Sequence, residues 1–119
     1  MKYHFENLEV YQLSVSLTKE IYSIAKKLPK IEEYALKQQL IRAVTSIVLN
    51  IAEGSGKRTL GEKTNYISVA LGSLQETIAI IKLMVDLEEL SGEDVLMIEE
   101  LEEKLYFKLI AFKKSLKTF

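Results

Sequence analysis

The chain has 119 residues, with 16 lysines and arginines against 17 aspartates and glutamates, one histidine and no cysteine. At about 100–200 residues per domain this length predicts one domain, and an apolar fraction of 48% excludes a disordered tail. The net charge of −1 differs from the strong positive charge that nucleic-acid binders usually carry. The chain begins without the apolar run of a secretory signal, and no uninterrupted apolar run approaches about 18 residues. We therefore expect a soluble cytoplasmic protein that does not span a membrane.

The first predicted element is a helix over residues 8–28. Its apolar residues recur at intervals of three and four, which is one face of a helix with 3.6 residues per turn. This stripe is formed by Val10, Leu13, Leu17, Ile21, Ile24 and Leu28. Pro29 ends the helix, because a proline disfavours helical geometry in the residue before it.

The second predicted helix, residues 33–53, is apolar around almost its whole circumference. One face carries Leu36, Leu40, Ala43, Ile47 and Ile51, and the other sides carry Val44, Val48, Leu49 and Ala52. A helix that is apolar on all sides must be covered on all sides. Either this helix is central in its own subunit, or a second subunit covers its outer side. The second explanation is the leading hypothesis.

The third predicted helix, residues 60–88, follows a loop that Gly54 and Gly56 introduce. Thr59 and Glu62 have the spacing of a capping box at its start. Its core stripe alternates steps of four and three and consists of Ile67, Leu71, Leu74, Ile78, Ile81 and Val85. Gly72 lies inside this helix at a cost of about 1 kcal/mol relative to alanine. We therefore expect Gly72 to permit a close approach of another backbone.

The fourth predicted helix, residues 92–117, has Ser91 as its expected cap. Nine acids and no base lie between Asp86 and Glu103, and five lysines and no acid follow from Lys104 onward. This distribution complements the helix dipole, which we prefer over an acidic or basic docking patch. Because no segment alternates like a strand and the connections are short, the sequence predicts an all-α, antiparallel up-down-up-down four-helix bundle.

Few residues here can carry catalytic or metal chemistry. Nucleophilic cysteine catalysis is impossible without cysteine, and a single histidine, His4, excludes the paired Glu-x-x-His pattern of di-iron bundles and the usual zinc sites. The segment 54–59 differs from a phosphate loop, because Ile51 occupies the first glycine position and Arg58 follows Lys57. We expect no catalytic residue, cofactor or metal.

Three cations surround the start of the third helix: Lys57, Arg58 and Lys63. A helix N-terminus beside such cations can bind a phosphate. An ordinary solvated loop is the preferred interpretation, and contact with RNA or DNA is the alternative.

A polar stripe interrupts the apolar second helix. It consists of Arg42, Ser46, Asn50 and Glu53, and the third helix carries Gly72, Ser73 and Glu76. Paired carboxylates such as Glu53 and Glu76 can perform acid–base work if a cleft holds them together. The preferred interpretation is a polar network between helices or subunits, since an unpartnered buried charge is costly. With Val44 and Val48, these residues form the candidate subunit interface or polar network.

Several of these segments together resemble a known family. They are the run from Asn50 to Gly54, preceded by residues 39–43 and 46–47, and the segment 66–76 that contains Gly72 and Ser73. Residues 5–12 and the stop at residues 28–29 add to the likeness. The chain resembles, from Phe5 to about Leu90, the bacterial four-helix-bundle proteins encoded in intervening sequences of ribosomal RNA genes. That family includes the accessory protein of diversity-generating retroelements.

The resemblance implies a four-helix subunit that assembles into a homopentameric ring, and most members have no established activity. The leading hypothesis is a non-catalytic homo-oligomer, a pentamer, that serves as a scaffold or adaptor. The alternative is an RNA- or DNA-binding accessory protein associated with ribosomal RNA intervening sequences or with a reverse transcriptase.

Overall fold

The computed structural model describes residues 3–30 and 35–116. Four helices dominate this part of the chain: α1 spans Glu9–Ala25, α2 Leu36–Ser55, α3 Leu60–Asp86 and α4 Leu96–Ser115. A short 3₁₀ helix, η1, spans His4–Asn7 before α1. The described residues contain no strand, so the prediction of an all-α four-helix bundle is confirmed.

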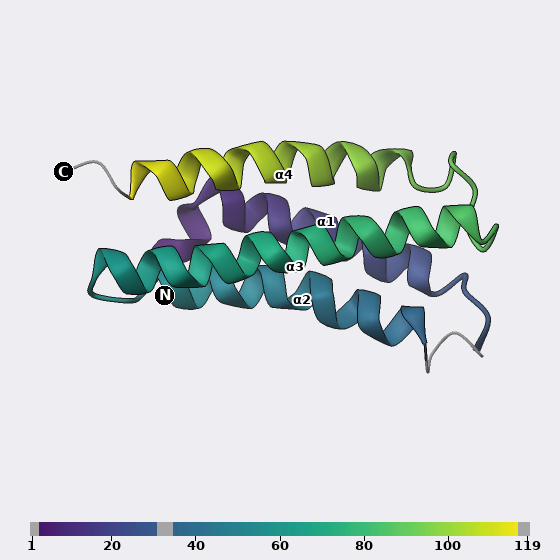
Figure 1. Ribbon diagram of the computed structural model, residues 1–119, viewed down its shortest axis with the longest axis horizontal. Helices are drawn as coiled ribbons and strands as arrows, with labels where there is room; N and C mark the ends of the chain where they lie inside the picture. Colours follow the sequence, from purple (N-terminus) through teal and green to yellow (C-terminus); the bar gives the residue numbers. More distant parts are fainter. Residues whose placement is uncertain (1–2, 31–34, 117–119) are drawn as a thin grey trace.

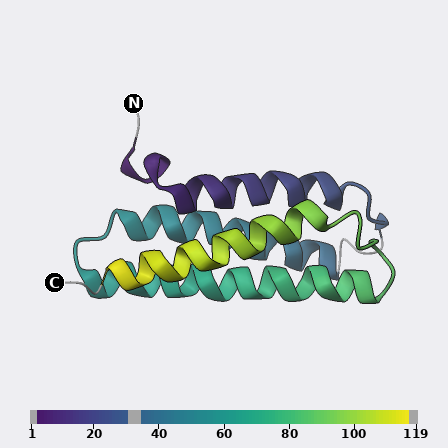
Figure 2. The same ribbon diagram turned by 90° about the horizontal axis from the view of Figure 1, so that it is seen from above.

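The helices lie side by side along the long axis of a rod that measures 47 × 26 × 22 Å. α1 and α3 run in one direction and α2 and α4 in the other, so α2 and α4 begin at the same end of the rod (Figure 1). Both α2 and α4 pack against α1 and α3. Seen from above, α4 crosses in front of the other helices, which places α2 and α4 on opposite sides of the bundle (Figure 2).

Among the predicted stripe residues of α3, Leu71, Ile78 and Val85 are only partly buried, and Ala70, Ile80 and Met84 are buried instead. The core therefore matches the predicted apolar stripes only in part. Its largest fully buried side chains are Leu17, Ile21, Leu40, Ile47, Ile51, Ile67, Leu74, Ile81, Met84, Ile98, Leu105 and Leu109. All four helices contribute to this cluster, which is continuous from one end of the rod to the other. At its surface, Lys108 Nζ lies 3.2 Å from Glu9 Oε1 and links α4 to α1.

The first two helices end at residues different from those predicted. α1 ends at Ala25, before the expected residue 28, because the amides of Lys27 and Leu28 bond to carbonyls three residues back in a tighter turn. α2 continues to Ser55 instead of stopping at residue 53, so Gly54 is helical rather than part of the loop. The expected start of this helix at residues 33–34 lies outside the described residues.

α3 begins as predicted, because the side-chain oxygen of Thr59 accepts a hydrogen bond from the Glu62 amide. It ends two residues earlier than expected. There the amide of Glu89 bonds to the Met84 carbonyl and that of Glu88 to the Val85 carbonyl, which is the Schellman pattern of a helix end. Glu88 occupies the position with φ 62° that glycine usually fills.

The prediction that Ser91 caps the fourth helix is wrong. The Ser91 amide does donate to the Asp94 carboxylate and the Asp94 amide to the Ser91 hydroxyl, both at 3.1 Å. Hydrogen bonding of Ser91 to the carboxylate lowers the pKa of Asp94. They close a separate turn, however, and α4 begins only at Leu96. Buried Leu90 and Val95 hold this turn against the core on both sides. The expected last residue, 117, lies outside the described residues.

By length and mean hydropathy alone, α3 is able to cross a membrane. Core helices of soluble bundles meet the same criteria, and α3 packs against α2 and α4 with seven buried side chains. The absence of a membrane span stays a prediction.

A glycine does permit a close approach of two helices, but this glycine is Gly54 rather than Gly72. A Cβ atom added to Gly54 would lie 2.7 Å from the Tyr66 Cβ on α3, whereas one added to Gly72 would meet nothing within 4 Å. A short loop joins α2 to α3 and begins close to Gly54, so the two helices are near each other there. Gly72 lies farther along α3, on its exposed side. The expectation of a close approach at Gly72 is therefore wrong within the subunit.

Candidate functional site

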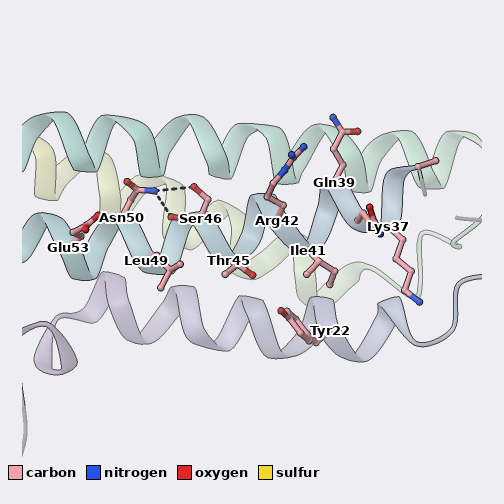
Figure 3. Close-up of a pocket in the computed structure, with 12 residues that line it drawn as sticks. Tyr22, Lys37, Gln39, Ile41, Arg42, Thr45, Ser46, Leu49, Asn50 and Glu53 are labelled. Atoms are coloured by element: carbon pink, nitrogen blue, oxygen red, sulfur yellow. Dashed lines mark hydrogen bonds between the residues drawn. The ribbon is translucent and has the colours of Figure 1, made fainter. Parts of the chain in front are cut away.

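The outer face of α2 lines a groove of about 1170 Å³. Tyr22 on α1 forms part of one wall, and Ile41 and Leu49 contribute apolar surface along α2 (Figure 3). The polar side chains Ser46 and Asn50 lie nearer to α3 in the same view. The groove therefore has an apolar side toward α1 and a polar side toward α3.

Three of the predicted polar residues form one hydrogen-bonded network. The hydroxyls of Ser46 on α2 and Ser73 on α3 lie 2.8 Å apart. The Asn50 amide nitrogen donates to the Ser46 carbonyl at 2.8 Å and to its hydroxyl oxygen at 3.0 Å. The Thr77 hydroxyl donates to the Ser73 carbonyl at 2.8 Å, which extends the network along α3. This network joins α2 to α3 within one subunit.

The charged members of the predicted set stay outside this network. Arg42, Glu53 and Glu76 are exposed, and among the described residues none of them makes a hydrogen bond or ion pair. Glu53 lines the groove and Glu76 does not. The expectation that all these residues form one satisfied network is therefore wrong within a single subunit. The structure also gives no common cleft to the two carboxylates.

The apolar flanks of α2 differ from one another in exposure. Val44 is completely buried in the core of its own subunit, so its assignment to a contact with another subunit is not supported. Val48 is half-buried, and Leu49 is 60% exposed. α1 and α3 thus cover most of the circumference, and the uncovered part is the groove around Leu49.

The three predicted cations lie together at the α2–α3 loop, but two of them have partners in the chain. The Lys57 ammonium lies 5.1 Å from the centre of the Tyr66 ring, a cation–π contact. The Lys63 ammonium donates to the Ser55 carbonyl at 3.1 Å and so satisfies an acceptor at the end of α2. Arg58 is exposed.

Glu102, which lies on α4 facing α3, is a buried acid that was not among the predicted site residues. The side chain is 3% exposed, and its Oε2 atom accepts no hydrogen bond from the described residues. Burial, together with the nearby carboxylate of Glu99, raises the pKa of Glu102 to about 8, although Lys82 opposes the shift. The signal was present in the sequence: Glu102 lies four residues after Ile98 and three before Leu105, so it shares one face of the helix with these two apolar residues.

The described residues contain no group of three or more histidines, aspartates or glutamates arranged to hold a metal ion.

The chain is similar to known proteins in sequence and in fold. Residues 6–111 match the family described as 23S rRNA-intervening sequence protein. Among solved structures, it is similar to a protein of unknown function from the S23 ribosomal protein family of Bacteroides thetaiotaomicron. That likeness has a TM-score of 0.81 and 24% identity, and it covers 92% of this chain and 99% of that chain. No curated protein matches the sequence. At this identity the structural likeness shows the fold alone.

Proposed function

Since the chain belongs to the family of 23S rRNA-intervening sequence proteins, we propose that it is a non-catalytic homo-oligomer, a pentameric ring, that acts as a cytoplasmic scaffold or adaptor. The family membership confirms the resemblance that the segments 46–54 and 66–76 carry. Members of such a ring present the same surface several times, which suits a protein that gathers partners rather than one that transforms a substrate.

The observation that carries this proposal is the uncovered apolar side of the α2 groove. Leu49 is 60% exposed and Tyr22 is 45% exposed, and both line the same groove as Ile41. Fully burying an exposed leucine side chain contributes about 1.5–3 kcal/mol. A second copy that covers this surface gains that contribution at every contact of the ring.

The oligomeric state tests the proposal directly. Size-exclusion chromatography with light scattering at micromolar concentration is expected to give a mass near five times the 13.6 kDa of one chain. A stable monomer of 13.6 kDa would overturn the proposal.

A variant of the groove locates the contact. Leu49→Lys places a charge on the apolar side of the groove and is expected to dissociate the oligomer into single chains. The helix content of the variant, measured by circular dichroism, is expected to stay unchanged because Leu49 is already exposed in one subunit. Leu87→Lys is the matched control, since Leu87 is 54% exposed at the end of α3 and does not line this groove. An assembly equally stable in both variants would place the contact elsewhere.

The α2–α3 loop supports a second candidate function, an accessory protein that binds RNA or DNA. Lys57 and Lys63 have fixed positions on either side of exposed Arg58, so three cations are presented together at one end of the bundle. In a ring each subunit would present one such loop, so several weak contacts with the same nucleic acid would add up to a higher overall affinity.

Gel-shift titration with RNA and with DNA tests this candidate. Binding is expected at about 50 mM salt and is expected to weaken steeply as salt rises, because phosphate contacts release counterions. Arg58→Glu is expected to abolish the shift, whereas Lys19→Glu makes the same charge change on exposed α1 surface and is expected to leave it. No shift of either nucleic acid at the low salt concentration excludes the candidate.

A further inference from the structure

A second groove, of about 860 Å³, lies between α3 and α4 and contains an unsatisfied acceptor. Glu102 lines this groove with its buried carboxyl group, whose Oε2 atom has no partner among the described residues. Lys82, a cation that also lines this groove, is engaged with Glu99, whose Oε2 lies 3.5 Å from the lysine Nζ. A buried carboxyl without a donor is costly, so the groove favours an incoming hydrogen-bond donor.

The rim of the groove indicates which kind of donor it suits. Glu99 and Glu103 add two carboxylates, and Tyr106 and Phe107 add aromatic surface. Phe107 is 62% exposed. Carboxylates beside aromatic rings favour a planar guanidinium, which can bond a carboxylate with two N–H groups and stack on a ring.

Arg42 supplies such a group on another side of the same molecule. It is exposed in the α2 groove and makes no hydrogen bond or ion pair with the described residues. Figure 3 shows its side chain extending from α2 on the side of the groove nearer to α3. Within one subunit Arg42 and Glu102 lie on opposite helices of the bundle, α2 and α4, which do not contact each other.

The two residues lie at the same height along the rod. Arg42 is the seventh residue of α2 and Glu102 the seventh residue of α4, and both helices begin at the same end (Figure 1). Two copies placed side by side with parallel long axes therefore bring Arg42 of one level with Glu102 of the other, without a shift along the axis. A rotation axis parallel to the rod produces that arrangement.

We infer that the guanidinium of Arg42 from one copy enters the α3–α4 groove of the next copy and pairs with the carboxyl group of Glu102, which is ionised once the guanidinium lies beside it. This inference rests on the proposed homo-oligomer and names the two surfaces that meet in it. The contact joins two different faces, so it is heterologous, and repeating it closes a ring when the rotation between copies permits.

The exposed apolar residues of the two surfaces agree with this pairing. Leu49 is the fourteenth residue of α2 and Phe107 the twelfth of α4, so their heights differ by about 3 Å at 1.5 Å per residue. Both side chains are more than half exposed. The pairing that brings Arg42 to Glu102 also brings Phe107 toward the apolar side of the α2 groove.

A double-mutant cycle measures the contact. Arg42→Met keeps the apolar stem of the side chain, and Glu102→Gln keeps its shape. Each is expected to raise the concentration at which the assembly dissociates by at least about thirty-fold, which is the cost of leaving one partner of a charge pair alone. The double variant is expected to dissociate no more readily than either single variant, because the same interaction is lost only once. If the fold-changes in dissociation concentration of the two single variants multiply in the double variant, the inference is overturned. It is also overturned if neither single variant changes that concentration.

Charge reversal gives a readout that does not depend on the buried position. Arg42→Glu lies on the surface and is expected to leave the subunit folded, as judged by circular dichroism, yet monomeric. Arg58→Glu changes the charge equally on the α2–α3 loop and is expected to leave the assembly intact. A wild-type monomer would refute the proposed function itself. A wild-type oligomer that is indifferent to Arg42→Glu would refute only this pairing.

The absence of cysteine allows the neighbours to be mapped by cross-linking. A mixture of Arg42→Cys and Glu103→Cys chains, treated with a short bis-maleimide, is expected to give a covalent dimer, since Glu103 is exposed on the rim of the α3–α4 groove. Arg58→Cys mixed with Glu103→Cys is the matched control and is expected to stay uncoupled. Equal yields in both mixtures contradict the pairing.

Discussion

Two helical hairpins of this bundle, α2–α3 and α3–α4, satisfy their polar and steric requirements to different degrees. In the first, glycine occupies the point of closest approach to Tyr66, Thr59 caps α3, and the Ser46 and Ser73 hydroxyls meet at 2.8 Å. In the second, Glu88 takes a backbone position with φ 62°, and the carboxyl of Glu102 is buried without a donor.

The difference lies in how much polar surface each hairpin leaves unsatisfied among the described residues. The α2–α3 hairpin pairs two hydroxyls across its helices but buries the Thr45 Oγ1 atom without a partner, whereas the α3–α4 hairpin buries a carboxyl group that a donor from a neighbouring molecule can satisfy. A buried polar group without a partner in its own chain is expected at a surface that contacts another molecule.

The largest expected effect concerns the pH dependence of the isolated subunit. The raised pKa of Glu102, about 8, means that the folded state keeps a proton that the unfolded chain releases above its ordinary pKa of 4.5. Raising the pH therefore lowers the free energy of unfolding by about 1.4 kcal/mol per pH unit between roughly pH 5 and 8. Urea unfolding of the Arg42→Glu variant, where the subunit is expected to be free, is expected to show this slope.

Adding Glu102→Gln to that variant is expected to remove the slope, since an amide does not titrate. Glu103→Gln is the control, because Glu103 is exposed on the same helix. A slope that survives Glu102→Gln would mean that another group is responsible and would weaken the contrast between the two hairpins.

The next effect tests the close packing of the first hairpin. Gly54→Ala forces a methyl group to within 2.7 Å of the Tyr66 Cβ, and we expect it to lower the free energy of unfolding by about 1–3 kcal/mol. The matched change Gly72→Ala meets open space and is expected to stabilise the subunit by about 1 kcal/mol through helix propensity. Thermal unfolding of both variants measures the difference, and effects of the same sign would contradict the packing described.

A smaller effect is expected from the hydroxyl pair between α2 and α3. Ser46→Ala or Ser73→Ala removes the 2.8 Å hydrogen bond and is expected to cost about 1 kcal/mol, and the double variant is expected to cost less than the sum. Chemical denaturation of the two single variants and the double variant measures these changes in the free energy of unfolding. Strict additivity would mean that the two hydroxyls contribute independently.

The smallest expected effect concerns the helix end in the second hairpin. Glu88→Gly relieves the left-handed backbone conformation and is expected to raise the free energy of unfolding by up to about 1 kcal/mol. Glu93→Gly, in the following turn, is the control and is expected to give no such gain. A loss of stability in Glu88→Gly would show that its side chain contributes more than its backbone costs.

The sequence predicts those parts of the fold that depend on local spacing. The stripes of apolar residues locate all four helices, and the Thr59–Glu62 spacing predicts the start of α3 because the cap uses only neighbouring atoms. The same type of spacing at Ser91 and Asp94 predicts the wrong start for α4. The hydrogen bonds between these two residues close a turn that ends before the helix begins at Leu96.

The candidate surfaces are less predictable because they depend on which sides of each helix its neighbours cover. Val44 and Leu49 look equivalent in the sequence, yet one is buried in the core and the other is 60% exposed. The close contact at Gly54 and the open space at Gly72 likewise depend on how α3 lies against α2. The burial of Glu102 follows from an apolar stripe, but the acidic residues around it suggest a solvated face.

The pairing of α1 with α4 has a consequence for the order in which the bundle forms. The Lys108–Glu9 ion pair joins helices at opposite ends of the chain, whereas α2 and α3 are separated by only a few residues. Closing a short loop costs less chain entropy than closing a long one. We therefore expect the central hairpin to form early during folding and the first and last helices to dock onto it late, so that brief openings of the native state begin at these outer helices.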